Sequence, residues 1–138
     1  MPTTGGPRSH PEPGTVPLDT REAAQALLRT YFDIAEAWHL SSKEAMTLLG
    51  LRSRSTYHLW KGGKSGPLSP DTLERVSYVL GIYKALQMLL PSDDAADAWI
   101  RKPNEAPLFG GRSALDRMLS GNVADLYEVR RYLDAQRG

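Results

Sequence analysis

Apolar residues recur along most of this chain every three or four positions, which is the spacing of an amphipathic helix. The alternation of apolar and polar residues that would indicate a β-strand is nearly absent. The pattern therefore predicts an all-α fold. The first predicted helix, over residues 20–39, carries the apolar positions Ala24, Leu27, Leu28, Tyr31, Ile34, Ala35 and Trp38.

Capping signals divide the first two thirds of the chain into four predicted helices. Asp19 and Ser41 are each followed three residues later by Glu, the pattern of a capping box. Gly50 stands where a helix would end, and Ser69 precedes a proline, a favourable first helical residue. Gly81 is expected to weaken the fourth helix. The predicted helices cover residues 20–39, 41–49, 53–61 and 70–90.

The residue pattern in the last third of the chain predicts three shorter helices and one loop. Ser92 and Asn122 are each in position to cap a helix. Prolines and glycines exclude regular structure from Lys102 to Gly111. Predicted helices cover residues 93–101, 113–120 and 123 onwards. We therefore expect two domains, 19–91 and 92–138, preceded by a disordered tail, 1–18, that is rich in Pro and Gly.

Composition and charge narrow the class of protein. The chain has 138 residues, 41% of them hydrophobic, and a formal net charge of +1. A charge this close to zero means that nucleic-acid binding must come from a local cluster of cations. The sequence contains no cysteine, so neither disulfides nor thiolate metal sites can form. No apolar run approaches the ~20 residues of a membrane span, and a signal peptide is not expected. We expect a cytoplasmic protein without membrane contact.

The segment from Ser41 to Lys61 has the pattern of a helix-turn-helix, in which a glycine-containing turn joins two short helices. Gly50 supplies the turn, and Leu51 and Leu59 are expected to hold the second helix against the first. No acidic residue occurs in positions 52–70, so the stretch is locally basic despite the low net charge. The pattern therefore indicates DNA binding, with a purely structural helix pair as the alternative.

In a helix-turn-helix the second helix lies in the major groove, with its N-terminal part facing the base edges. For Arg54, a contact to DNA and a solvated charge both remain open. Trp60 is expected to pack in the core rather than to stack on bases. The candidate DNA-binding residues are Arg52, Arg54, Ser55, His58, Lys61 and Lys64.

Signals of catalysis or metal binding are weak. Gly63-Lys64-Ser65 resembles the end of a phosphate loop, but His58 stands where that motif needs its first glycine, and no strand precedes it. The histidines lack second ligands at metal spacing. The aspartates at the start of the 93–101 helix most simply match the helix dipole. We expect no enzymatic activity, no catalytic residue, no metal and no cofactor.

The end of the chain combines a helix ending in Trp-Ile, a Lys-Pro-Asn loop, a Leu-Phe-Gly-Gly turn and a short Leu-rich helix followed by glycine. In the predicted helix 53–61 the characteristic residues are Arg54-Ser55-Thr56-Tyr57 and Trp60-Lys61. At the end of the chain they are Trp99-Ile100, Lys102-Pro103-Asn104, Leu108-Phe109-Gly110-Gly111-Arg112-Ser113, Leu115, Leu119, Gly121, Val129 and Leu133. They make residues 41–138 resemble the Xre/MbcA/ParS antitoxins of bacterial type II toxin–antitoxin pairs. The chain departs from the usual pattern at Ala114, where that family has Pro, and at Met46, where helix-turn-helix motifs prefer Ala.

The resemblance implies an N-terminal Xre-like helix-turn-helix bundle followed by a small helical toxin-binding domain. Members of that family neutralise toxins with a RES domain, which consume NAD or transfer ADP-ribose from it, by covering the active-site entrance. A dimer of the helix-turn-helix represses its own operon. The implied partners are a cognate RES-domain toxin, operator DNA and a second copy of the chain. The alternative is a helix-turn-helix regulator whose C-terminal block serves dimerisation or ligand sensing.

The loop from Lys102 to Arg112 and the last helix form the candidate toxin-binding surface, because aromatic and Arg residues are favoured anchors of interfaces. Phe109 either is exposed there or fills a small C-terminal core. An Arg near the C-terminus suits the entrance of a pocket that binds NAD phosphates, and an inert frayed end is the alternative. The candidate toxin-binding residues are Asn104, Leu108, Phe109, Arg112, Arg130, Arg131, Arg137 and Gly138.

A homodimer is expected from the two long helices, 20–39 and 69–90. Both carry more apolar residues than one narrow stripe needs, and a short helical chain has limited capacity to bury them. The apolar residues that suggest a dimer surface are Leu28, Phe32, Trp38, Ile82, Tyr83, Met88 and Leu89.

Overall fold

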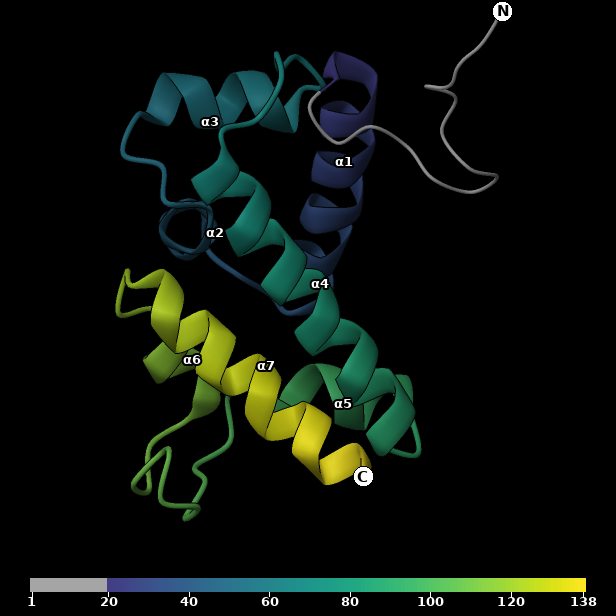
Figure 1. Cartoon of the computed structure of the whole chain (residues 1–138), viewed down its shortest axis with the longest axis vertical. Coiled ribbons are helices and arrows are strands. Elements are labelled where there is room, and N and C mark those ends of the chain that lie inside the picture. The colour runs from purple at the N-terminus through teal and green to yellow at the C-terminus, as the bar shows by residue number, and fades with distance from the viewer. Residues whose placement is uncertain (1–19) are drawn as a thin grey trace, which may run out of the picture.

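The computed structural model describes residues 20–138, which fold into seven helices without a β-strand among these residues (Figure 1). The all-α prediction is confirmed, and each predicted helix is present within a few residues of its expected bounds. The predicted N-terminal tail and the capping role of Asp19 lie outside the described residues. The helices are α1 (Arg21–Ala37), α2 (Ser42–Leu49), α3 (Arg54–Lys61), α4 (Pro70–Leu89), α5 (Asp93–Trp99), α6 (Ala114–Met118) and α7 (Val123–Arg137).

Hydroxyl side chains begin most of these helices. The Ser41 hydroxyl accepts a bond from the Glu44 N–H at 3.0 Å, and the Glu44 carboxylate accepts one from the Ser41 N–H at 2.9 Å. This confirms the predicted capping box. Ser69 and Ser92 cap α4 and α5 as expected. Helix α1 begins after Thr20, whose hydroxyl accepts a backbone N–H bond of 3.1 Å.

The start of α7 differs from the sequence expectation. Asn122 occupies the cap position, but its side chain makes no capping hydrogen bond. The Ser120 hydroxyl instead accepts a bond of 3.1 Å from the Asn122 N–H and donates one of 2.6 Å to the Asp125 carboxylate. Asp125 also pairs with Arg117 at 3.1 Å. Ser120 and Asp125 therefore hold the turn into α7, and the Asn122 side chain has no role in the cap.

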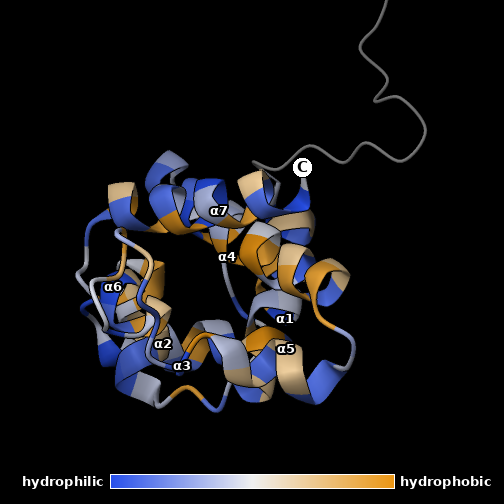
Figure 2. Ribbon diagram, turned by 90° about the horizontal axis from the view of Figure 1, so that it is seen from below, coloured by the Kyte–Doolittle hydropathy of each residue, from blue (hydrophilic) through white to orange (hydrophobic). Residues whose placement is uncertain are grey.

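Helix α4 occupies the centre of the fold. Helices α1 and α2 pack against it from the first part of the chain, and α5 and α7 pack against it from the last part, α7 most extensively. Figure 2 shows hydrophobic residues facing inward between these helices and hydrophilic residues on the outside. Apolar residues on several sides of α4 need cover from more than one neighbouring helix, and both halves of the chain contribute that cover.

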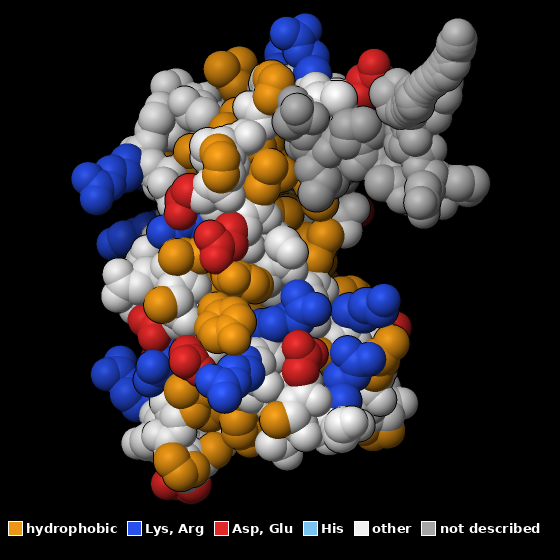
Figure 3. Space-filling model, viewed as in Figure 1, with side chains coloured by type: hydrophobic (Ala, Val, Ile, Leu, Met, Phe, Trp, Pro, Cys, Tyr) orange, Lys and Arg blue, Asp and Glu red, His pale blue; other side chains and the backbone are white. Residues whose placement is uncertain are grey.

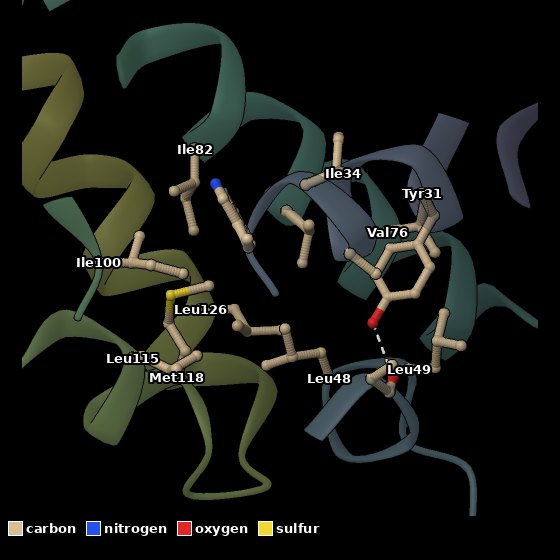
Figure 4. Packing of buried hydrophobic residues seen from close by; sticks show 14 of the residues in the cluster. Tyr31, Ile34, Leu48, Leu49, Val76, Ile82, Ile100, Leu115, Met118 and Leu126 are labelled. Carbon is tan, nitrogen blue, oxygen red and sulfur yellow. Dashed lines mark hydrogen bonds between the residues drawn. The ribbon is translucent and has the colours of Figure 1, made fainter. Parts of the chain in front are cut away.

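The buried side chains form one continuous cluster. Figure 4 shows Ile100 and Met118 from the last part of the chain in the same cluster as Ile82 and Val76 of α4 and Tyr31 of α1. The two parts of the chain therefore share their hydrophobic core.

Tyr31 adds a polar link inside this core. Its hydroxyl donates a hydrogen bond of 2.7 Å to the backbone carbonyl of Ala45 in α2 (Figure 4). Burial raises the pKa of Tyr31, so the phenol stays protonated and remains a donor at neutral pH. This bond fixes α2 relative to α1.

Two arginine side chains join the halves outside the core. The guanidinium of Arg101, which follows α5, donates to the carbonyls of Trp38 at 3.0 Å and His39 at 2.8 Å, just beyond the end of α1. The guanidinium of Arg75 on α4 donates to the Gly121 carbonyl at 3.0 Å, on the turn that precedes α7. Both guanidinium groups satisfy carbonyls that lack a helical partner, which is a common role of cations near helix ends.

Most of the apolar residues that suggested a dimer surface are covered within the chain. Leu28, Trp38 and Ile82 are buried in the shared core, so these three are not available for a dimer surface. The physical reason is the central position of α4, which gives its apolar residues partners on several sides. Met88 is the exception, because it is 57% exposed.

Gly81 lies in the middle of α4, which is continuous through it. A Cβ at this position would collide with the guanidinium of Arg130 on α7. The glycine therefore allows the Arg130 side chain to lie directly over the α4 backbone. No helix within residues 20–138 combines the length and the apolar character needed to cross a lipid bilayer.

The shared core predicts that residues 20–138 unfold as one cooperative unit. Ile82→Ala removes a side chain that is 0% exposed, which should lower the free energy of unfolding by about 2–5 kcal/mol. Amide hydrogen exchange should accelerate in α1 and in α7 by the same factor, because both helices depend on α4. The exposed Leu59→Ala is the matched control, with an expected change below about 0.5 kcal/mol. Faster exchange confined to one half would contradict a shared core.

Candidate functional site

Helices α2 and α3 form the predicted helix-turn-helix. Gly50 ends α2 with a φ of 73°, in the left-handed region, and its N–H donates to the Thr47 carbonyl at 3.0 Å. The Ser53 hydroxyl then caps α3 by accepting a bond of 3.2 Å from the Thr56 N–H. Leu51, between the two, packs partly buried against the core as expected. The turn thus has the left-handed glycine that joins two helices of this motif.

The inner face of α3 is formed by Tyr57 and Trp60. Tyr57 is 3% exposed and packs edge-on against Phe32 of α1, with ring centroids 5.6 Å apart. Trp60 is partly buried against the core, which confirms its predicted packing role. Leu59 is 55% exposed, so the expectation that it holds α3 down is wrong. The aromatic residues on either side take that position, since they lie three residues apart on the same side of the helix.

The outer face of α3 carries the predicted DNA contacts. Arg54, His58 and Lys61 are three or four residues apart, so they share one side of the helix. Among the described residues, no carboxylate lies within salt-bridge distance of any Arg or Lys of this set. Their charges are therefore available to phosphates. All six candidates are exposed: Arg52, Arg54, Ser55, His58, Lys61 and Lys64.

The C-terminal candidate surface begins with the loop after α5, which has neither helix nor strand, as predicted. Its base is closed by a single bridge between Pro103 and Ser113. The Asn104 N–H donates to the Arg112 carbonyl at 3.0 Å, and its carbonyl accepts from the Gly111 N–H at 2.8 Å. Its side-chain oxygen accepts a bond of 2.9 Å from the Ala106 N–H. The Asn104 side chain therefore shapes the loop from within.

An aromatic trio attaches the loop to α7. The Phe109 ring contacts Tyr132 on α7 edge-on, with centroids 5.1 Å apart, and it contacts Trp99 on α5 at 5.9 Å. Trp99 and Tyr132 are themselves stacked at 6.5 Å. Phe109 is buried, so it fills the C-terminal core and is not exposed for a partner. The contact between Tyr132 and the loop was not predicted from the sequence. The only indication in the sequence is that all three residues are aromatic.

The predicted basic residues of the C-terminal part have different surroundings. Arg112 is 77% exposed and Arg131 69% exposed, and each has only a long ion pair with a residue on its own segment. Arg137 and Gly138 are also exposed, at the end of α7. Arg130 instead lies over Gly81 and bonds to Asp134 at 3.2 Å. Figure 3 shows Lys and Arg side chains gathered over the half of this face that α7 crosses, with Asp and Glu between them.

A hollow of about 360 Å³ opens between the loop and the turn that precedes α7. The Arg117 guanidinium spans it, donating to the Leu108 carbonyl at 3.0 Å and pairing with Asp125 at 3.1 Å. The hollow has both apolar and charged walls, which suits a side chain of a protein partner. Its walls are Leu108, Phe109, Arg112, Ser113, Asp116, Arg117, Ser120 and Asp125.

The acidic start of α5 has no metal-binding arrangement. In residues 20–138, no group of three or more His, Cys, Asp and Glu side chains is placed to hold a metal ion. Burial raises the pKa of the Asp97 carboxyl, and the neighbouring carboxylates of Asp93 and Asp94 raise it further. Asp93 and Asp94 are exposed in the first turn of α5, where the helix dipole favours them.

The two surfaces define a helix-turn-helix protein with a second, helical binding module. Residues 17–81 match the family model of the antitoxin Xre-like helix-turn-helix domain, and residues 85–138 match that of the antitoxin Xre/MbcA/ParS C-terminal toxin-binding domain. The Uncharacterized protein y4oB of Sinorhizobium fredii (strain NBRC 101917 / NGR234) is 46% identical over 130 residues, which are 94% of this chain and 98% of that protein. The chain belongs to the Xre/MbcA/ParS family of antitoxins.

The geometry of the turn predicts that Gly50→Ala destabilises the fold more than Gly63→Ala. Both glycines have positive φ, 73° and 89°, so both variants should lose about 1–2 kcal/mol from backbone strain. A Cβ at Gly50 would also lie 2.8 Å from Arg75 Nε, whereas a Cβ at Gly63 meets nothing within 4 Å. Thermal unfolding measures the difference. Equal losses in the two variants would show that Arg75 does not restrict the turn.

Proposed function

We propose that this antitoxin neutralises a cognate RES-domain toxin, which consumes NAD or transfers ADP-ribose, by covering the toxin's active-site entrance, and that it represses its own operon through α3. The observation that carries the proposal is the separation of two exposed basic surfaces. Figure 1 shows α3 at one end of the long axis and the loop after α5 at the other. Operator DNA and toxin can therefore be bound without competing for the same residues.

The support for operator binding comes from α3. Tyr57 and Trp60 hold its inner face against the core, so the outer face is a rigid platform. Its cations have no carboxylate partner within the described part of the chain. A repressor of this kind reads two half-sites one helical turn apart. We therefore propose that it acts as a homodimer, to which Met88, the most exposed large apolar residue of α4, contributes.

The support for toxin covering comes from the exposed groups around the C-terminal loop and the end of α7. Arg112, Arg131 and Arg137 reach into solvent from two segments that Phe109 and Tyr132 hold together. A guanidinium can bind the phosphate oxygens or the acidic groups of a nucleotide pocket with two parallel hydrogen bonds. The match of residues 85–138 to a toxin-binding domain favours this function over that of a regulator whose C-terminal block only dimerises or senses a ligand.

Arg54→Ala should weaken binding to the DNA upstream of the chain's own reading frame. Loss of a bidentate base contact costs about 1–3 kcal/mol, whereas loss of a phosphate contact lowers the salt slope by about one. Fluorescence anisotropy at several salt concentrations separates the two cases. Arg131→Ala, on α7, is the control. Unchanged affinity and unchanged salt dependence would rule out a DNA contact by Arg54, and toxin neutralisation should be intact.

Deleting residues 136–138 should abolish neutralisation of the toxin while leaving the fold and DNA binding unchanged. These residues are exposed, whereas Leu133 and Tyr132 belong to the core or pack on it, so a longer deletion would also destabilise the protein. Arg137→Ala tests the guanidinium alone, and Arg54→Ala serves as the control. The measurement is growth during co-expression with the toxin, together with co-purification of the complex. Full growth of cells that produce the toxin and the truncated chain would indicate that the loop after α5, and not the end of α7, covers the active-site entrance of the toxin.

A further inference from the structure

Leu59 is a large apolar residue on the face of α3 that is proposed to meet DNA. It is 55% exposed, although α3 itself is firmly held by Tyr57 and Trp60. Its exposure is therefore a property of its position on the helix and does not result from loose packing. Leu59 follows Ser55 by four residues, so it extends the side of α3 that begins with a candidate base contact.

The surroundings of Leu59 are cationic. It lies at a shallow hollow of about 390 Å³, whose walls include Arg21 and Lys64. Neither cation has a carboxylate partner among the described residues. An apolar protein partner would have to desolvate these charges without compensation. A DNA duplex suits both features, because it presents phosphates on either side of a groove that contains apolar groups.

We propose that Leu59 contacts the C5 methyl group of a thymine in the major groove and thereby sets the base preference at one position of each half-site. A leucine side chain can neither donate nor accept a hydrogen bond, so it cannot satisfy the polar edges of guanine, adenine or cytosine. The thymine methyl is the one apolar group that a base presents in the major groove. This inference rests on the proposed binding of operator DNA by α3.

The test uses duplexes from the region upstream of the chain's own reading frame, after footprinting has located the protected segment. Each thymine in that segment is replaced in turn by deoxyuridine, which removes only the C5 methyl group. At one position per half-site, the replacement should weaken binding of the unmodified protein about threefold to fivefold, the equivalent of one buried methyl group.

Leu59→Ala should lose this sensitivity and bind thymine and uracil duplexes equally. The fold should be unaffected, since the side chain is exposed, and thermal unfolding checks this. Tyr127→Ala is the matched control, because Tyr127 is also a large exposed residue, at 45%, but lies on α7, and it should retain the full sensitivity to deoxyuridine.

Two results would overturn the inference while leaving DNA binding intact. In the first, the unmodified protein binds every deoxyuridine duplex as tightly as the parent duplex. In the second, Leu59→Ala shows the same loss as the unmodified protein, which would mean that another residue contacts the methyl group. Absence of any binding to the upstream DNA by the unmodified protein would overturn the proposed repressor function itself, and the inference with it.

Discussion

The covering of α4 is the constraint on which the rest of this fold depends. Its apolar residues lie on several sides, so no single neighbouring helix can remove them from water. The chain meets this requirement by packing α1 and α2 against one part of the helix and α5 and α7 against the rest. The helix-turn-helix and the C-terminal helices are consequently two ends of one hydrophobic core and not two independently folded domains.

The candidate functional residues lie on the surface outside the shared core. The two ends of the molecule hold these exposed groups in place in different ways. In α3 the residues Tyr57 and Trp60 anchor one side of a helix, which frees the other side for cations. At the opposite end, Phe109 anchors an irregular loop through Tyr132 and Trp99. Aromatic residues suit this purpose because each provides a large buried area with few rotatable bonds. The exposed groups beside them are thus held in place without taking part in packing.

Much of the fold could be predicted from the sequence, because helix ends are decided by local chemistry. Ser41, Ser69 and Gly50 mark helix boundaries that the structure confirms. The errors occurred where the outcome depends on distant partners. Leu59 was expected to hold α3 down but is exposed, and of the two alternatives for Phe109 the structure shows the buried one. The burial of an apolar residue in a short helix or loop depends on its neighbours in the fold, which the local sequence does not specify. Likewise, the local sequence does not show that most of the excess apolar residues of α4 are covered within the chain, because α7, which packs most extensively against α4, lies at the other end of the sequence.

The position of Arg75 couples the turn of the helix-turn-helix to the start of α7. One face of its guanidinium lies close to Gly50 in the helix-turn-helix, and the same group donates to the carbonyl of Gly121 before α7. A side chain at position 50 would displace this guanidinium and thereby weaken its bond to the Gly121 carbonyl. A substitution in the turn between α2 and α3 can therefore alter the support of the turn before α7, although the two turns belong to different family domains.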